Sequence, residues 1–135
     1  MGGDTLVKKN FLRLTPDKPD QFGFVWSRQL LDSKDFSITW KIRISGDSKE
    51  RYGNFLALSL TLDRKKSTGP IFGHREDFTG VMVIVDTNPM DRLNGRHFDV
   101  GVLTNNGKFD PHIRLNLQGC ASGLRYYEGR DDFNI

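Results

Sequence analysis

Strict alternation of apolar and polar residues constrains the fold of this chain more than any other feature. From Phe36 to Ile44 every even position is apolar and every odd position is polar. Successive side chains of a β-strand point to opposite faces, so this period is typical of a strand with one buried and one solvated face. We therefore predict a strand over residues 36–44, with Trp40 packed in the core.

The same period of two returns later in the chain. Alternation covers Leu56 to Leu62 and Phe98 to Val102, whereas Val81 to Val85 is apolar on both faces, as in a central strand. Shorter candidate strands lie at residues 22–27, 113–117 and 124–127.

Turn residues separate these strands, and the Asn-Gly step at residues 106–107 predicts a tight hairpin. No window sustains the spacing of an amphipathic helix. About seven strands joined by turns predict an all-β antiparallel sandwich or barrel, as one domain over residues 1–135.

Charge and composition exclude several classes of protein. The 135 residues include 20 basic and 17 acidic side chains, intermingled along the chain, which argues against nucleic-acid binding. No apolar run approaches the roughly 18 residues of a membrane span, and no apolar signal-type segment follows Met1. We expect no membrane insertion and no signal peptide in this chain. Cys120 is the only cysteine, so no internal disulfide can form.

The sequence offers no catalytic constellation. A glycosidase would need a pair of carboxylates held about 5–10 Å apart. The glutamates Glu50, Glu76 and Glu128 are not spaced two or four positions from an aspartate on a strand. Cys120 lies in a glycine-rich segment with no histidine nearby in sequence. We therefore expect that the protein is not an enzyme.

Several motifs occur in a characteristic order. The stretch GPIFG at residues 69–73 precedes Gly80-Val81, and an apolar strand then runs into DTNPMD at residues 86–91 and Asn-Asn-Gly at 105–107. This series resembles the legume-like (L-type) lectins of the early secretory pathway, over about Leu12 to Asn106. The lectin domain of that family is a jelly-roll β-sandwich that is longer at both ends. The resemblance therefore implies a truncated form of that fold.

The family resemblance also implies a function. L-type lectins of this group bind high-mannose N-glycans, usually with calcium, on glycoprotein cargo that moves between the endoplasmic reticulum and the Golgi. The implied location is the lumen of these compartments. By the same resemblance, Asp86 and Asn88 are the candidate calcium ligands. Asp91 is the candidate substitute for the ligand lost at Met90, because a thioether is a poor ligand for a hard cation.

The sugar-binding residues implied by the resemblance are Asn54, Asn88 and His112. Asn54 stands where the family has an aspartate, and an amide binds a hydroxyl less strongly than a carboxylate does. Leu115 stands where the family has an acidic calcium ligand. We therefore expect weakened binding of both calcium and sugar.

Structural roles remain open for each candidate. Asp86 is equally compatible with a simple turn initiator, and His112 with a structural residue at the start of a strand. His74 is expected at the surface. The alternative function is that of a lectin-derived sandwich that has lost sugar binding and makes protein contacts. Strands missing from the sandwich would leave open sheet edges, which favour a homodimer.

Overall fold

The described part of the chain is built almost entirely from β-strands. The computed structural model describes residues 1–46, 53–63, 68–88, 99–121 and 132–134. The strands are β1 Gly2–Gly3, β2 Leu6–Val7, β3 Leu12–Arg13, β4 Gly23–Phe24, β5 Lys41–Arg43, β6 Phe55–Thr61, β7 Thr79–Asp86, β8 Val100–Asn106, β9 Gln118–Cys120 and β10 Asp132–Asn134, with the 3-10 helix η1 at Ile113–Asn116. The predicted all-β class is therefore confirmed.

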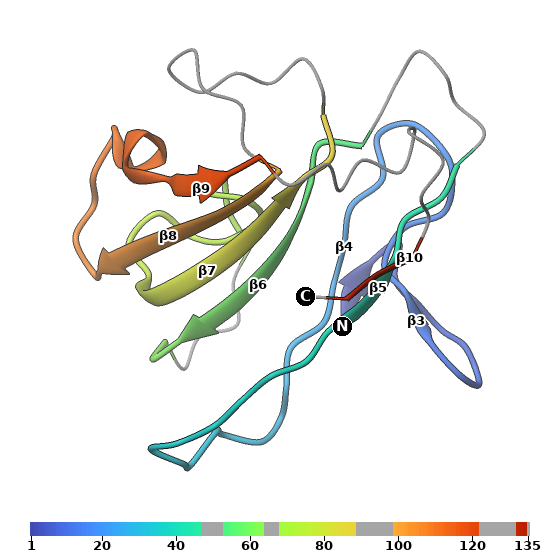
Figure 1. Ribbon diagram of the computed structural model, residues 1–135, viewed down its shortest axis with the longest axis horizontal. Coiled ribbons are helices and arrows are strands. Elements are labelled where there is room, and N and C mark those ends of the chain that lie inside the picture. Colours follow the sequence, from blue (N-terminus) through green and yellow to red (C-terminus); the bar gives the residue numbers. More distant parts are fainter. Residues whose placement is uncertain (47–52, 64–67, 89–98, 122–131, 135) are drawn as a thin grey trace.

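A four-stranded antiparallel sheet in the order β6-β7-β8-β9 forms the main layer (Figure 1). Leu58 on β6 lies opposite Val83 on β7, which lies opposite Val102 on β8. The predicted strands at 56–62 and 81–85 are confirmed, and β7 is a central strand as its apolar run indicates. Phe98, the expected start of the next strand, lies outside the described residues.

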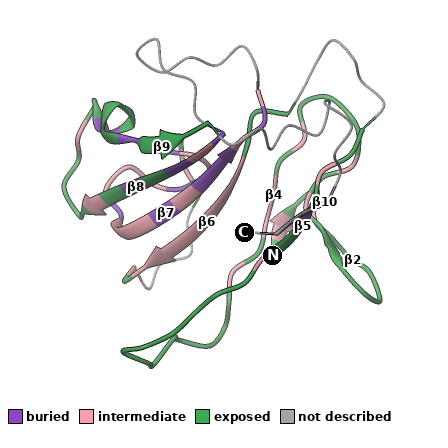
Figure 2. Cartoon of the chain, viewed as in Figure 1, coloured by how far each residue is buried: buried purple, intermediate pink, exposed green. Residues whose placement is uncertain are grey.

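The core covers one face of this sheet. Met82 and Ile84 on β7 and Leu103 on β8 are at most 1% exposed. Their layer is closed by side chains from the connecting segments: Ile71, Phe78, Ile113 and Leu117. Figure 2 shows the buried residues concentrated on β7 and β8. Burial of each large apolar side chain contributes about 1.5–3 kcal/mol to folding.

The remaining strands form short ladders. β1 pairs with β4, β2 with β3, and β5 with β10, all antiparallel. These pairings join the beginning of the chain to β4, and its last described residues to β5. Both termini consequently lie in this second group of strands, outside the main sheet (Figure 1).

The long strand predicted at residues 36–44 is wrong in extent. Only Lys41–Arg43 forms a strand, and Ile42 is its buried residue. Phe36 and Ile38 are 51% and 42% exposed, and Trp40 is only half-buried. Alternation indicates that a segment could form a strand, but a ladder partner must also be present. Among the described residues, β10 pairs with residues 41–43, and the ladder does not extend to the rest of the predicted strand.

The segment between β8 and β9 also differs from the prediction. Residues 113–116 form η1, not a strand, and Ile113 and Leu117 are buried while Leu115 is 51% exposed. Ile113 begins η1, and Leu117 follows its last residue with an extended backbone, so the helical turn lets both side chains reach the core while Leu115 faces solvent. In a strand, Ile113, Leu115 and Leu117 would all have lain on one face. Gly107 adopts positive φ (89°), as the turn prediction requires, but η1 separates it from β9, so the tight hairpin is wrong. The candidate strand at residues 124–127 lies outside the described residues.

Candidate functional site

Three of the predicted site residues meet at one end of the main sheet. Asn54 precedes β6 and Asp86 ends β7, and these neighbouring strands are antiparallel. The Thr87 backbone N–H donates to the Asn54 carbonyl at 3.1 Å, and the Asn88 side-chain amide lies 3.4 Å from the Asn54 Oδ1 oxygen. The strand register therefore brings Asn54, Asp86 and Asn88 together.

The Asp86 carboxylate organises the loop that follows β7. Its Oδ1 accepts the backbone N–H of Asn88 at 2.8 Å, which is the hydrogen bond of an Asx turn. Thr87 is 5% exposed, and its hydroxyl donates to the Gly53 carbonyl at 2.5 Å. The turn-initiator role is thus present. A carboxylate has about four lone-pair sites, so an Asx turn does not by itself exclude a role in binding a cation or a sugar hydroxyl.

Within its described residues, the structure shows no contact between these three and another predicted site residue. Asp91 and Met90 lie outside the described residues. His112 is the N-terminal cap of η1 and does not begin a strand, so that expectation is wrong. Its backbone N–H donates to Asp110 Oδ1 at 2.8 Å, and its side chain is exposed. The sugar-binding role of His112 stays a prediction.

Asp99 is a carboxylate near the site that sequence reasoning did not identify. The Asp86 backbone N–H donates to the Asp99 carbonyl at 2.9 Å, and Asp99 is only 2% exposed. Its position within the alternating segment Phe98 to Val102 was the available signal. Within the parts of the chain that the structure describes, no three or more His, Cys, Asp or Glu side chains are grouped as a metal site.

An aromatic and cationic row borders this end of the sheet. The Phe55 and Phe72 rings meet edge to face with centroids 5.2 Å apart, and the Arg114 guanidinium lies 5.2 Å from the Phe72 centroid. Phe55 follows Asn54 directly and lies opposite Asp86 in the ladder. Sequence reasoning treated Phe72 only as part of a turn, and the partners that reveal the row are distant in sequence.

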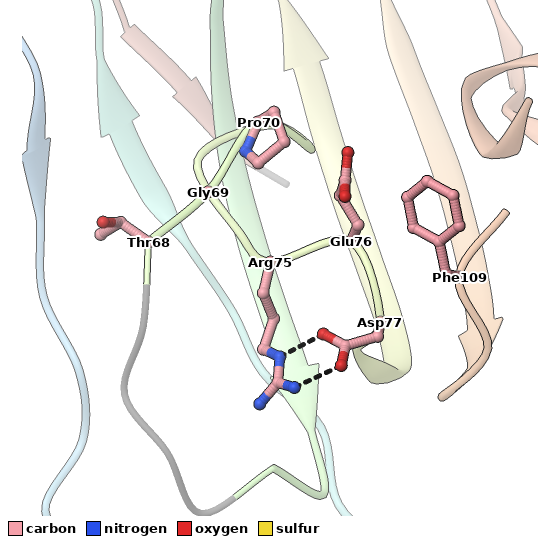
Figure 3. A pocket seen from close by; sticks show the side chains of 7 residues that line it. All are labelled: Thr68, Gly69, Pro70, Arg75, Glu76, Asp77 and Phe109. Atoms are coloured by element: carbon pink, nitrogen blue, oxygen red, sulfur yellow. Dashed lines mark hydrogen bonds and ion pairs between the residues drawn. The ribbon is translucent and has the colours of Figure 1, made fainter. Parts of the chain in front are cut away.

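A recess of about 360 Å³ lies between the segment that precedes β7 and the segment that follows β8 (Figure 3). Its lining includes Pro70, Arg75, Asp77 and Phe109. The Arg75 guanidinium and the Asp77 carboxylate form a bidentate ion pair, which holds the pKa of Asp77 below its ordinary value. Asp77 precedes the start of β7, whereas Asp86 ends it. The recess is therefore distinct from the predicted lectin site.

His74 is buried, contrary to the expectation of a surface histidine. It is 2% exposed, and its ring lies edge to face with Trp26 and Phe78 at centroid distances of 5.3 and 5.4 Å. Desolvation lowers the pKa of His74, and the Arg75 carbonyl beside Nδ1 partly opposes that shift. His74 also closes the GPIFG turn through paired backbone hydrogen bonds with Ile71.

Together, this fold and the strand-end loop define the class of the protein: an L-type-lectin-like β-sandwich. The family model described as the legume-like lectin family matches residues 1–125. The chain belongs to the legume-like lectin family, as the order of its motifs predicted.

Relatives of known identity agree with this assignment. Vesicular integral-membrane protein VIP36 of Canis lupus familiaris is 32% identical over 130 residues, which cover 91% of this chain and 36% of VIP36. The VIP36-like protein of Mus musculus is 33% identical over 131 residues, covering 91% of this chain and 38% of that protein. The chain thus spans little more than a third of the length of these relatives.

Solved structures of lectin domains have the same fold. The VIP36 exoplasmic/lumenal domain in its Ca²⁺/Man-bound form aligns with a TM-score of 0.80 at 28% identity, covering 98% of this chain and 56% of that one. Its Ca²⁺/Man2-bound form aligns with a TM-score of 0.78 at 31% identity, covering 92% and 52%. Among the described residues, no helix is both long enough and apolar enough to span a membrane.

Proposed function

We propose that residues 1–135 form a single partial lectin domain that binds high-mannose N-glycans. The observation that carries this proposal is the meeting of Asn54, Asp86 and Asn88 at one strand end, in a member of the legume-like lectin family. The ligands are glycoproteins in transit between the endoplasmic reticulum and the Golgi, and the domain works in their lumen. Solved VIP36 lumenal domains bind Ca²⁺ and mannose, which supports this assignment. The function is binding without catalysis.

Calcium is the proposed cofactor, held weakly by Asp86, Asn88 and Asp91. Carboxylate and amide oxygens are the hard ligands that Ca²⁺ prefers, so the chemistry of this donor set fits the ion. Bound calcium would fix the loop after β7 in one geometry. Leu115 offers no side-chain oxygen, and fewer charged ligands mean lower affinity. We expect a dissociation constant of about a millimolar or weaker, in the range of the weakest extracellular calcium sites.

Sugar recognition is assigned to Asn54, Asn88 and His112, which offer hydrogen bonds to hydroxyl groups. The neutral amide of Asn54 gives up the charge-assisted strength that a carboxylate would provide. The Asn54 and Asn88 side chains already contact each other at 3.4 Å. A sugar hydroxyl that binds Asn54 Oδ1 would replace this long contact.

Calorimetric titration tests this proposal. Calcium and then a high-mannose oligosaccharide are added to the wild type, to Asp86→Ala and to Asp32→Ala, an exposed aspartate that serves as the matched control. We expect weak, calcium-dependent glycan binding that Asp86→Ala abolishes and Asp32→Ala preserves. Equal glycan binding by all three proteins would refute the assigned site.

A second candidate function is protein contact through the sheet edges, including homodimer formation. In the sheet that the structure describes, β6 and β9 are the outer strands, and all residues of β9 are exposed. Exposed strand edges carry backbone groups that can pair with another chain. Sedimentation across a wide concentration range tests this candidate, and a monodisperse monomer throughout would rule out the homodimer.

A further inference from the structure

Arg114 is held in a fixed position on the surface of the protein. Its Nη2 donates to the Pro70 carbonyl at 2.5 Å, and its guanidinium lies over the Phe72 ring. The side chain belongs to an exposed residue of η1. Stacking on a ring and one hydrogen bond orient the planar guanidinium. The Arg114 side chain would therefore lose less conformational entropy when a ligand binds to it.

The positive charge of Arg114 has no acidic partner among the residues that the structure describes. The nearby carboxylate of Asp110 accepts the backbone N–H of His112, and Asp77 pairs with Arg75. The bond to Pro70 uses only part of the N–H donors of a guanidinium. The remaining donors are available for an oxyanion such as a carboxylate or a phosphate, which guanidinium binds in bidentate fashion.

The ring beneath Arg114 is itself maintained at a conformational cost. Phe72 adopts positive φ (48°). For any residue other than glycine, this left-handed backbone conformation is less stable than the right-handed one. Its neighbour Gly73 also has positive φ (81°), and the Ile71–His74 pairing closes the turn around both. The turn therefore directs Phe72 toward Phe55 and Arg114.

The row continues directly into the proposed glycan site. Arg114 contacts Phe72, Phe72 contacts Phe55, and Phe55 lies opposite Asp86 in the β6–β7 ladder, so that their side chains share one face of the sheet. Each of the two ring contacts spans 5.2 Å, so Arg114 lies beside the Asp86 side of the site and not within it. Phe55 is 38% exposed and offers an apolar surface between the two.

We propose that Arg114 and Phe72 form an anion-binding subsite, so that the lectin site selects glycans with an acidic substituent. This inference rests on the proposed glycan-binding function. The shared chemistry of the ligand is an oxyanion on a sugar, either a phosphate monoester or a carboxylate. Arg114 would bind the oxyanion, while Asn54 and its neighbours bind the hydroxyls of the adjoining sugar.

The test compares methyl mannoside, mannose 6-phosphate and N-acetylneuraminic acid by NMR titration in the presence of calcium. We expect one of the acidic sugars to bind at least about tenfold more tightly than methyl mannoside, as one charge-assisted contact would provide. The tighter of the two identifies the anion. Arg114→Gln should abolish the preference and Arg114→Lys should retain part of it. Arg13→Gln, which removes the same charge from the β2–β3 hairpin, should leave it unchanged.

Each outcome separates this inference from the proposed function. Binding of all sugars without an acidic preference overturns the subsite and leaves the lectin assignment standing. Binding of an acidic sugar alone supports the subsite and overturns neutral high-mannose recognition, whereas binding of neither overturns both. If Arg114→Gln does not fold, the wild-type Arg114 Nε–H resonance decides. It should shift on addition of the acidic sugar, and an unchanged resonance refutes the subsite.

Discussion

Acidification should destabilise this protein through His74. The imidazole is packed between Trp26 and Phe78, and both His74 Nε2 and Trp26 Nε1 are buried without a hydrogen-bond partner in the described structure. Protonation would place a positive charge in this aromatic surrounding, which explains why desolvation lowers the pKa of His74. The folded state therefore favours neutral His74.

The sign and the ceiling of the effect follow from proton linkage. In the unfolded chain His74 titrates near its ordinary pKa of about 6.5, above its pKa in the folded state. Below this pH the unfolded state binds a proton that the folded state does not bind. Stability is then lost at no more than about 1.4 kcal/mol per pH unit, until the folded pKa is reached. Solvent screening and the carboxylates of Asp63 and Asp77 reduce the loss.

Urea unfolding at pH 7.5 and pH 5.5, followed by tryptophan fluorescence, measures this loss. His74→Phe keeps an aromatic ring against Trp26 and Phe78 but removes the titration, and His112→Gln removes an exposed histidine as the control. Contributions from shared carboxylates cancel in the difference between variants. We expect a smaller loss on acidification in His74→Phe than in the wild type or His112→Gln. Equal losses in all three would refute the reasoning.

Further perturbations have defined expectations. Phe78→Ala removes a fully buried ring and should lower the free energy of unfolding by about 3–5 kcal/mol, measured by thermal or urea denaturation. Gly101→Val should cost about 1–3 kcal/mol in the same assay, because an added Cβ would lie 2.8 Å from Leu117 Cδ1; unchanged stability would show that Leu117 can move aside. The pair Asn54→Asp with Met90→Asn should raise calcium and mannose affinity in calorimetry, and a folded variant with no gain would contradict the ligand assignment.

Local patterns in the sequence were sufficient for the main sheet and for the family. Alternation and the apolar run at Val81–Val85 predicted β6 and β7, because the side-chain period of a strand is a property of the backbone itself. The order of the motifs from Gly69 to Asn106 identified the lectin family. The meeting of Asn54 with Asp86 also follows from sequence, once adjacent strands are taken as antiparallel.

Contacts between distant segments decided the rest. The alternation at residues 36–44 is as regular as that of β6, yet only Lys41–Arg43 found a ladder partner. His74 is buried because Trp26 and Phe78 meet around it, and Arg114 acquires its orientation from Pro70 and Phe72. Alternation records which face of a strand a side chain occupies, but not which segment covers that face. That covering depends on packing between residues far apart in the chain, so only the tertiary structure could place these side chains.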